Sequence, residues 1–397
     1  MGKNLFIHEN VNKEALKKKA FNYRWAEIED GVIPLTAADP DFPVAPEIKN
    51  ALINYINDGY FSYSPHTGLE DFKVAIANSL NSRKNEFVSS ELVLPIDSAA
   101  RGMFLIANTV LEEGDEVIVF DPVDYLFRES TLNAKGVPVL FPAKLDNNGY
   151  IDLSELKNYI TKKTKMICLC NPHNPLGAVY SKENLELILD LANEHDLWIM
   201  NDEIWADIVY SDSKFLSILS LGVERNKKTL SVFGFSKSFG IAGLRAGCVY
   251  AHEQEIFNKI LENSNMITTA GGITSLSQIA GIACLNESYY WVEEFIKHLE
   301  KNRDYAVERL NKMNKITCHL PSATYLVFPN ISETGMTSEV FVERLKEEAK
   351  LAVVPGTAKF FGPGAEGHIR ICYATSFEIL EEGLDRMEDW VNKNIDK

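Results

Sequence analysis

The chain has 397 residues, of which 46% are hydrophobic, 10% aromatic and 24% charged. This composition is typical of a globular protein with two or three domains' worth of chain, and it excludes disorder and collagen-like repeats. Lys+Arg 40 against Asp+Glu 56 give a net charge of −16, spread along the whole chain. Nucleic acid and anionic membranes are therefore not expected as partners.

The N-terminal residues MGKNLFIHEN contain no apolar run of signal-peptide length. Nowhere in the chain do about eighteen uninterrupted apolar residues occur, so we expect a soluble, cytoplasmic protein. The six cysteines form no CxxC pair and mostly lie within apolar runs. We therefore expect buried, reduced thiols and neither a metal site nor a disulfide framework.

Short apolar, β-branched runs alternate with segments of helical periodicity through the middle of the chain, as in residues 184–194, where leucine and isoleucine recur at helical spacing. This alternation predicts an α/β fold with a mostly parallel seven-stranded sheet flanked by helices on both faces. In such a fold, ligands bind at the carboxyl ends of the strands. The expected strands are 92–94, 117–120, 139–141, 166–169, 197–200, 230–233 and 247–251.

Both chain ends are expected to form a second, smaller α/β domain. Residues 1–48 end in the turn-rich stretch ADPDFPVAPE, and residues 289–397 contain charged helical runs at 292–313 and 376–395. The large domain then spans residues 49–288. No low-complexity linker or internal repeat interrupts the chain.

The most informative stretch is SVFGFSKSFGIAGLRAG at residues 231–247. Lys237 follows an apolar strand and has small neighbours, so its amine would lie in a partly desolvated place where it can be neutral and nucleophilic. Arg245 follows a glycine-rich turn and could return to the same pocket to bind an anion. The alternative is a surface lysine with a structural arginine, because reactive lysines are rare.

Polar residues also follow two other expected strands. The sequence NPHNPLG at residues 171–177 follows one strand, and NDEIW at residues 201–205 follows another. Alone, the first could be a proline-stiffened turn and the second a helix cap. Because all three stretches occur in order and at strand ends, they favour a functional site.

The chain resembles the aspartate-aminotransferase superfamily of fold-type I pyridoxal-phosphate enzymes in the order of its motifs. These motifs are NPxNPxG, then a strand ending in Asp-Glu, then SK with an arginine eight residues later. The resemblance covers nearly the whole chain. It implies that Lys237 holds pyridoxal 5'-phosphate as a Schiff base and later moves the substrate's α-proton. It also implies that Asp202 pairs with the pyridine nitrogen and keeps it protonated, so that the ring acts as an electron sink.

The resemblance implies further cofactor contacts. Asn174 matches the asparagine that hydrogen-bonds the ring's phenolic oxygen, and it is expected to contact the substrate as well. Arg245 matches the arginine on the phosphate. Ser98, Ala99 and Ala100 lie where the family places backbone amides and a helix N-terminus against the phosphate.

Two tyrosines and a second arginine complete the implied site. Tyr125 matches the aromatic residue stacked on the cofactor ring, although buried aromatic residues often only pack. Tyr63 matches a tyrosine that family members donate to the phosphate of the neighbouring subunit, which implies a homodimer with shared active sites. Arg370 matches the arginine that holds the substrate's α-carboxylate, a task that suits a planar guanidinium, and an ion-pair partner on a strand is the alternative.

The chain departs from the family's pattern at three places. Trp205 stands where many members have a tyrosine, and an indole N–H can donate a hydrogen bond but cannot ionise like a phenol. Gly234 stands where members often have a serine or threonine that binds the phosphate, and the loop at residue 98 lacks the usual glycine. Phosphate binding should therefore depend more on Ser236, Arg245 and backbone amides.

The resemblance leaves two reactions open. The stretches AADPDF at 37–42 and DEIWADIVY at 202–210 resemble the cystathionine β-lyase branch of C–S lyases, whereas Arg245 and the ending at 354–375 resemble ordinary aminotransferases. We expect an aminotransferase that moves an amino group between an L-amino acid and a 2-oxo acid. The alternative is a C–S β-lyase that releases thiol, pyruvate and ammonia.

Two other functional interpretations of the sequence are less favoured. A cofactor-binding protein without turnover would not need the complete set of Lys237, Asp202, Asn174 and Arg370. The GPGAEG sequence at 362–367 fits a GxGxxG pattern but opens no expected helix, which argues against dinucleotide binding.

Overall fold

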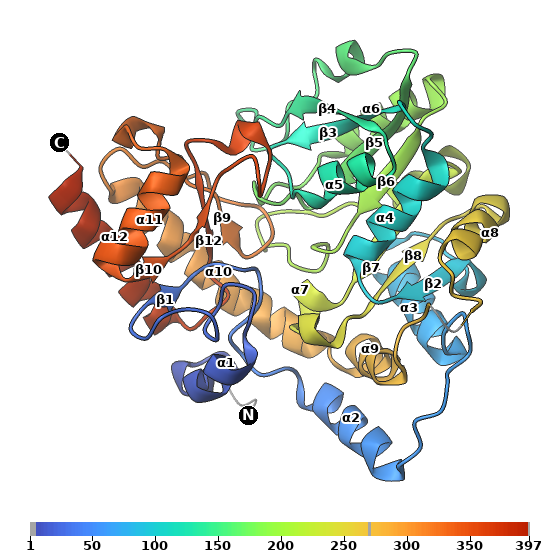
Figure 1. The fold of residues 1–397 in the computed structure, drawn as a ribbon, viewed down its shortest axis with the longest axis horizontal. Helices are drawn as coiled ribbons and strands as arrows, with labels where there is room; N and C mark the ends of the chain where they lie inside the picture. The colour runs from blue at the N-terminus through green and yellow to red at the C-terminus, as the bar shows by residue number, and fades with distance from the viewer. Residues whose placement is uncertain (1–4, 269–270, 396–397) are drawn as a thin grey trace.

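The computed structural model describes residues 5–268 and 271–395, and it has one large sheet with helices on both faces (Figure 1). The sheet has seven strands in the order β2-β8-β7-β6-β5-β3-β4. The strands from β7 to β4 in this order run parallel, whereas β8 is antiparallel to both of its neighbours. The strands are β2 (Val93–Ile96), β3 (Glu116–Asp121), β4 (Val137–Pro142), β5 (Thr164–Cys170), β6 (Trp198–Asp202), β7 (Thr229–Gly234) and β8 (Gly247–Tyr250).

Each of the seven expected strands is present, and the mostly parallel α/β sheet is confirmed. The central strands are buried along almost their full length, which explains why they are continuous apolar runs in the sequence. The helices of this part of the chain are α2 (Pro46–Asp58), α3 (Glu70–Lys84), α4 (Ala99–Val110), α5 (Leu126–Asn133), α6 (Lys182–Glu194), α7 (Ser236–Phe239), α8 (Gln254–Asn263) and α9 (Ser275–Glu287).

Side-chain caps set where two of these helices begin. Ser98 is the N-cap of α4, and its side chain accepts a hydrogen bond from the backbone N–H of Arg101 at 3.2 Å. Ser181 and Asn184 form a reciprocal capping box at the start of α6. The first cap matters for the site, because it fixes the helix end that follows β2.

The two ends of the chain meet beside the large sheet, where the N-terminal segment lies next to the C-terminal elements (Figure 1). Strand β1 (Ile33–Pro34) pairs in parallel with β10 (Leu351–Ala352). Strands β11 (Val354–Pro355), β12 (Ile369–Cys372) and β9 (Leu326–Val327) form a three-stranded antiparallel sheet. The helices are α1 (Lys13–Lys19), α10 (Tyr289–Lys312), α11 (Ser338–Ala349) and α12 (Phe377–Asn394).

All six cysteines are free and buried, as expected from their place in apolar runs. Within residues 5–268 and 271–395, no helix is both long enough and apolar enough to cross a membrane.

The sheet order determines where the three polar stretches lie. Strands β5, β6 and β7 are neighbours and run parallel, so their carboxyl ends lie along one edge of the sheet. The NPHNPLG turn follows β5, Asp202 is the last residue of β6, and Lys237 lies just beyond the end of β7. The backbone N–H of Asn171 donates to the carbonyl of Asp202 at 2.9 Å, which ties the first stretch to the second.

Candidate active site

Lys237 lies in a partly buried position where chain segments from three parts of the sequence meet. Its Nζ donates a hydrogen bond to the carbonyl of Ala38 at 2.8 Å and lies 5.5 Å from the ring centroid of Trp205. Burial lowers the pKa of the Lys237 amine, and the nearby carboxylate of Asp39 opposes that shift. A larger fraction of this amine is therefore neutral and nucleophilic than in a free lysine.

Asp202 is a buried carboxylate at the end of β6, with 8% of the residue exposed. Its Oδ1 accepts a hydrogen bond from the backbone N–H of Ile204 at 3.0 Å. The pKa of Asp202 is raised to about 7, chiefly by burial; the nearby Asp124 and Glu203 add to this rise, whereas that hydrogen bond and Lys237 oppose it. Among the described residues it has no ion-pair partner, so the carboxylate fits a cationic ligand group such as a protonated ring nitrogen.

Asn174 connects two charged side chains. Its Nδ2 donates to Asp124 Oδ2 at 2.9 Å, and its Oδ1 accepts a hydrogen bond from Arg370 at 3.3 Å. Sequence reasoning assigned no role to Asp124, although it stands next to Tyr125 after the expected strand 117–120. Asp124 could have been recognised as an acidic residue that follows an expected strand, because ligands bind at the carboxyl ends of the strands in this type of sheet.

Arg370 lies on β12 and is buried close to Asn174. One guanidinium nitrogen also donates to the carbonyl of Thr36 at 3.5 Å, and the buried Nε has no hydrogen-bond partner among the described residues. Burial lowers the pKa of Arg370, while Asp124 raises it. A buried guanidinium with unused donors can bind a carboxylate.

The N-terminus of α4 lies against β8. A Cβ atom placed on Gly247 would come within 2.9 Å of the backbone nitrogen of Ala99 and 3.0 Å of the carbonyl carbon of Ser98. The glycine therefore permits close contact between the strand and the start of a helix whose free N–H groups, including those near Ala100, attract anions. Arg245 is exposed, and within the described part of the chain no ion pair engages it.

Ser236 is the first residue of the short helix α7 and is partly buried one position before Lys237. Gly234 precedes it at the end of β7. A Cβ atom on Gly234 would lie 3.0 Å from Ile204 Cδ1, so a serine or threonine here would crowd that side chain.

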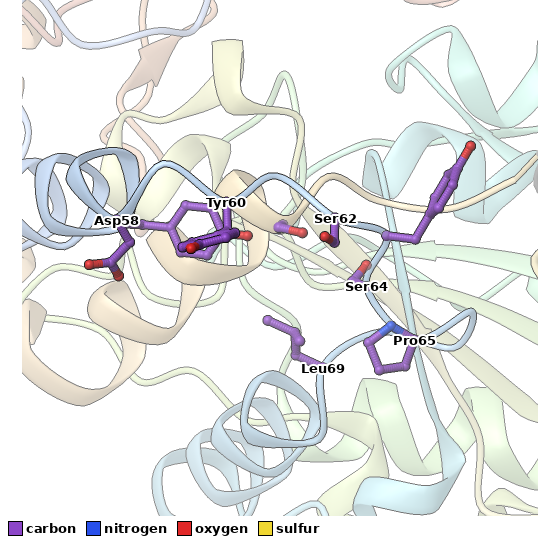
Figure 2. Close-up of a pocket in the computed structure, with 9 residues that line it drawn as sticks. Asp58, Tyr60, Ser62, Ser64, Pro65 and Leu69 are labelled. Carbon is purple, nitrogen blue, oxygen red and sulfur yellow. The ribbon is translucent and has the colours of Figure 1, made fainter.

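Tyr125 and Tyr63 are both exposed in this single chain. Tyr125 is 42% exposed, and the contact with Asn174 is made by its neighbour Asp124. Tyr63 is 91% exposed in this single chain. It lies on the segment between α2 and α3 and is one of the residues that line a surface pocket of ≈ 490 Å³. Figure 2 shows this pocket with its lining residues Tyr60, Ser62 and Ser64. The roles expected for these two tyrosines stay predictions.

Trp205 and His173 are both buried close to the site. The indole of Trp205 packs edge-on against Tyr325 with ring centroids 4.6 Å apart. His173 is fully buried in the turn after β5, and burial lowers the pKa of its ring to about 3. The His173 ring is therefore neutral near pH 7 and is not poised to exchange protons there.

Comparisons with known proteins identify the family of the chain. The family model for class I and II aminotransferases matches residues 30–387. The chain is 36% identical over 367 residues to an aspartate aminotransferase of Pyrococcus horikoshii, covering 92% of each protein. It also matches the crystal structure of an aromatic aminotransferase from Pyrococcus horikoshii, with a TM-score of 0.86 at 32% identity over 92% of this chain and 97% of that one.

The structure of cystalysin from Treponema denticola, which contains a pyridoxal 5'-phosphate cofactor, matches with a TM-score of 0.89, covering 98% of this chain and 100% of that one. Its sequence identity is 23%, so this match shows the shared fold alone. The comparisons therefore do not favour the C–S lyase alternative. The chain belongs to the class I and II aminotransferases and is a pyridoxal-phosphate-dependent enzyme that takes amino acids and 2-oxo acids as substrates.

Proposed function

We propose that the cluster around Lys237 is the transamination site of this enzyme. The observation that carries the proposal is a desolvated amine near a buried acid that forms no ion pair among the described residues. The first group suits an aldehyde and the second suits a protonated ring nitrogen, so the pair fits the two reactive ends of pyridoxal phosphate.

The other side chains of the cluster fit the rest of the cofactor. The N–H groups at the start of α4, from Ser98 to Ala100, together with Ser236 and Arg245, would bind the phosphate. The amide of Asn174 would donate to the ring oxygen, and Tyr125 would flank the ring.

The substrate site follows from Arg370. Its guanidinium would hold the α-carboxylate of an L-amino acid, with Asn174 beside it. When bound, pyridoxal phosphate supplies an electron sink that makes the substrate's α-proton removable. The neutral amine of Lys237 would accept that proton as a general base and then donate it again as a general acid. Its lowered pKa suits the first of these steps, because a larger fraction of the amine is neutral.

We also propose that the enzyme is a cytoplasmic homodimer. The segment between α2 and α3 presents Tyr60, Phe61 and Tyr63 to solvent, and the first two are 79% and 62% exposed. Contiguous exposed aromatic residues favour contact with another protein surface. A second copy would cover this segment and receive Tyr63 at its phosphate site. The residue divisions 1–48, 49–288 and 289–397 remain the proposed domains.

Chemical trapping tests the role of Lys237. The purified protein is incubated with pyridoxal phosphate, reduced with borohydride and digested, and the labelled peptide is located by mass spectrometry. We expect stoichiometric labelling of Lys237. Labelling of another lysine, or labelling spread over several exposed lysines, would overturn the assignment.

A further inference from the structure

We propose that Asp124 is a positioning residue that acts through Asn174 on both the cofactor ring and the carboxylate-binding Arg370. The inference rests on the proposed roles of Asn174 and Arg370. It adds a residue to which neither the sequence motifs nor the family comparison gave a role.

Two hydrogen bonds join Asp124 to Asn174. The Asp124 backbone N–H donates to the carbonyl of Asn174 at 3.1 Å, and the carboxylate Oδ2 accepts from Asn174 Nδ2 at 2.9 Å. The other carboxylate oxygen accepts from the backbone N–H of Leu126 at 3.1 Å, at the start of α5. The carboxylate therefore has a fixed position and cannot turn away from the amide.

Asp124 determines which way the amide of Asn174 faces. An amide has one acceptor oxygen and one donor nitrogen, whereas an ionised carboxylate only accepts and a guanidinium only donates. With Nδ2 on Asp124, Oδ1 faces Arg370 at 3.3 Å. The reversed amide would place oxygen against the carboxylate and N–H against the guanidinium, and it would lose both hydrogen bonds.

This orientation serves both ends of the proposed site. One N–H of Asn174 is used by Asp124, so the second N–H remains available for the cofactor's ring oxygen. Arg370 is held through Oδ1 of Asn174 and the carbonyl of Thr36, and its Nε has no protein partner among the described residues. The guanidinium is thus held in place with a donor left for a substrate carboxylate.

The backbone around Asp124 adds a link to the C-terminal part of the chain. The N–H of Val123 donates to the carbonyl of Phe361 at 2.8 Å, and the N–H of Tyr125 donates to the carbonyl of Phe360 at 3.1 Å. The guanidinium of Arg370 lies 5.0 Å from the ring centroid of Phe361. Asp124 therefore lies between the segment that packs on Arg370 and the turn that carries Asn174.

Steady-state kinetics of Asp124→Ala and Asp124→Asn test the proposal. The alanine variant should raise KM for the amino acid about 10- to 100-fold, the effect of losing a hydrogen bond to a charged group, while kcat changes less than about threefold. The asparagine variant keeps one oxygen that can accept from Asn174 Nδ2 and loses the acceptor that faces the Leu126 N–H, so its KM should rise less than about tenfold. Glu129→Gln, a neighbouring partly exposed acid, is the matched control.

A spectroscopic titration gives a readout that needs no turnover. Without substrate, the pH midpoint of the bound cofactor's absorbance change should be higher in Asp124→Ala than in Asp124→Asn, because both variants lose the carboxylate charge and only the alanine also frees Asn174 to turn. The reason is that a poorly oriented Asn174 stabilises negative charge on the ring oxygen less well. Glu129→Gln should keep the midpoint of the unmodified enzyme.

A double-mutant cycle with Asn174→Ala tests whether Asp124 acts through Asn174. In the Asn174→Ala background, Asp124→Ala should change KM by less than about threefold, because the connecting amide is already gone. Fully additive losses would overturn the proposal, as would an Asp124→Ala enzyme with the KM of the unmodified protein and the midpoint of Asp124→Asn. If Asp124→Ala fails to fold, a rise of more than about tenfold in KM for Asp124→Asn overturns it.

The failure of this inference and the failure of the proposed function give different results. If Arg370→Lys leaves KM unchanged, the carboxylate site itself is misassigned. If Arg370→Lys raises KM but Asp124→Ala does not, the site stands and only the positioning role of Asp124 is overturned.

Discussion

Lys237 Nζ donates a 2.8 Å hydrogen bond to the carbonyl of Ala38, although the two residues lie 199 positions apart in the chain. The hydroxyl of Tyr325 donates to the same carbonyl at 3.2 Å. The N-terminal segment, the large sheet and the C-terminal segment therefore meet at one oxygen atom. Their packing removes water from the amine, and this burial lowers its pKa.

Replacing Lys237 by alanine should remove the group that takes the α-proton. We expect turnover to fall at least about 10³-fold, within the range for loss of a general base. The measurement is the rate of cofactor conversion by an amino acid in a single turnover. Lys214→Ala, an exposed lysine, should keep the unmodified rate, and a Lys237→Ala enzyme that retains a tenth of its activity would contradict the assignment.

Replacing Arg370 by lysine should weaken substrate binding more than catalysis. A lysine keeps the charge but loses the planar fork that can bind both oxygens of a carboxylate, so we expect KM to rise about 10- to 100-fold. Initial rates at varied amino-acid concentration measure the effect, with Arg225→Lys, at a partly exposed arginine paired with Asp190, as control. An unchanged KM would exclude Arg370 as the carboxylate ligand.

The raised pKa of Asp202 predicts that the cofactor-free protein loses stability as the pH rises. Burial raises its pKa from 3.8 to about 7. Below about pH 4 the carboxyl is protonated in both the folded and the unfolded chain, and no penalty arises. As the pH rises toward 7 the unfolded chain ionises first, so stability falls by up to about 4 kcal/mol and then stays level.

Asp202→Asn removes that ionisation. In the cofactor-free state the variant should melt at a higher temperature than the unmodified protein, and the gain should be larger at about pH 8 than at about pH 5. It should also bind pyridoxal phosphate more weakly, because the ring nitrogen loses its partner. Thermal melts at the two pH values, with and without cofactor, measure this, and a gain independent of pH would contradict the raised pKa.

The shared-site proposal for Tyr63 predicts complementation between two defective chains. Lys237→Ala and Tyr63→Ala should each have little activity alone. After unfolding and refolding together, half of the dimers should be mixed, and each mixed dimer has one complete site out of two. About a quarter of the unmodified activity should then return. A mixture no more active than its separate components would argue against a site shared between subunits.

The sequence predicted the large sheet well, because its central strands are buried along almost their full length and therefore form continuous apolar runs in the sequence. Residues 230–233 were expected as a strand, and β7 spans Thr229–Gly234. Polar residues that directly follow these apolar runs are recognisable as strand ends, and Asp202 is indeed the last residue of β6. These features depend on local pattern and on the general rule for ligands in parallel sheets.

Contacts between distant segments could not be predicted in this way. The hydrogen bond from Lys237 to Ala38 and the pairing of β1 with β10 join residues hundreds of positions apart, and no local pattern encodes such partners. Asp124 was missed for a related reason. The resemblance assigned a role to the aromatic Tyr125 in this motif, whereas in the structure the carboxylate of Asp124 accepts a hydrogen bond from Asn174.

The most direct test of the central claim follows the cofactor spectrum of the pyridoxal-phosphate-loaded enzyme with a panel of L-amino acids, cystathionine included, and no 2-oxo acid, while released pyruvate and ammonia are measured. Transamination predicts one stoichiometric conversion of the cofactor to its amine form, no continuing ammonia release, and recovery of the original spectrum when a 2-oxo acid is added. Sustained production of pyruvate and ammonia, with the starting spectrum maintained, would contradict transamination and indicate β-elimination.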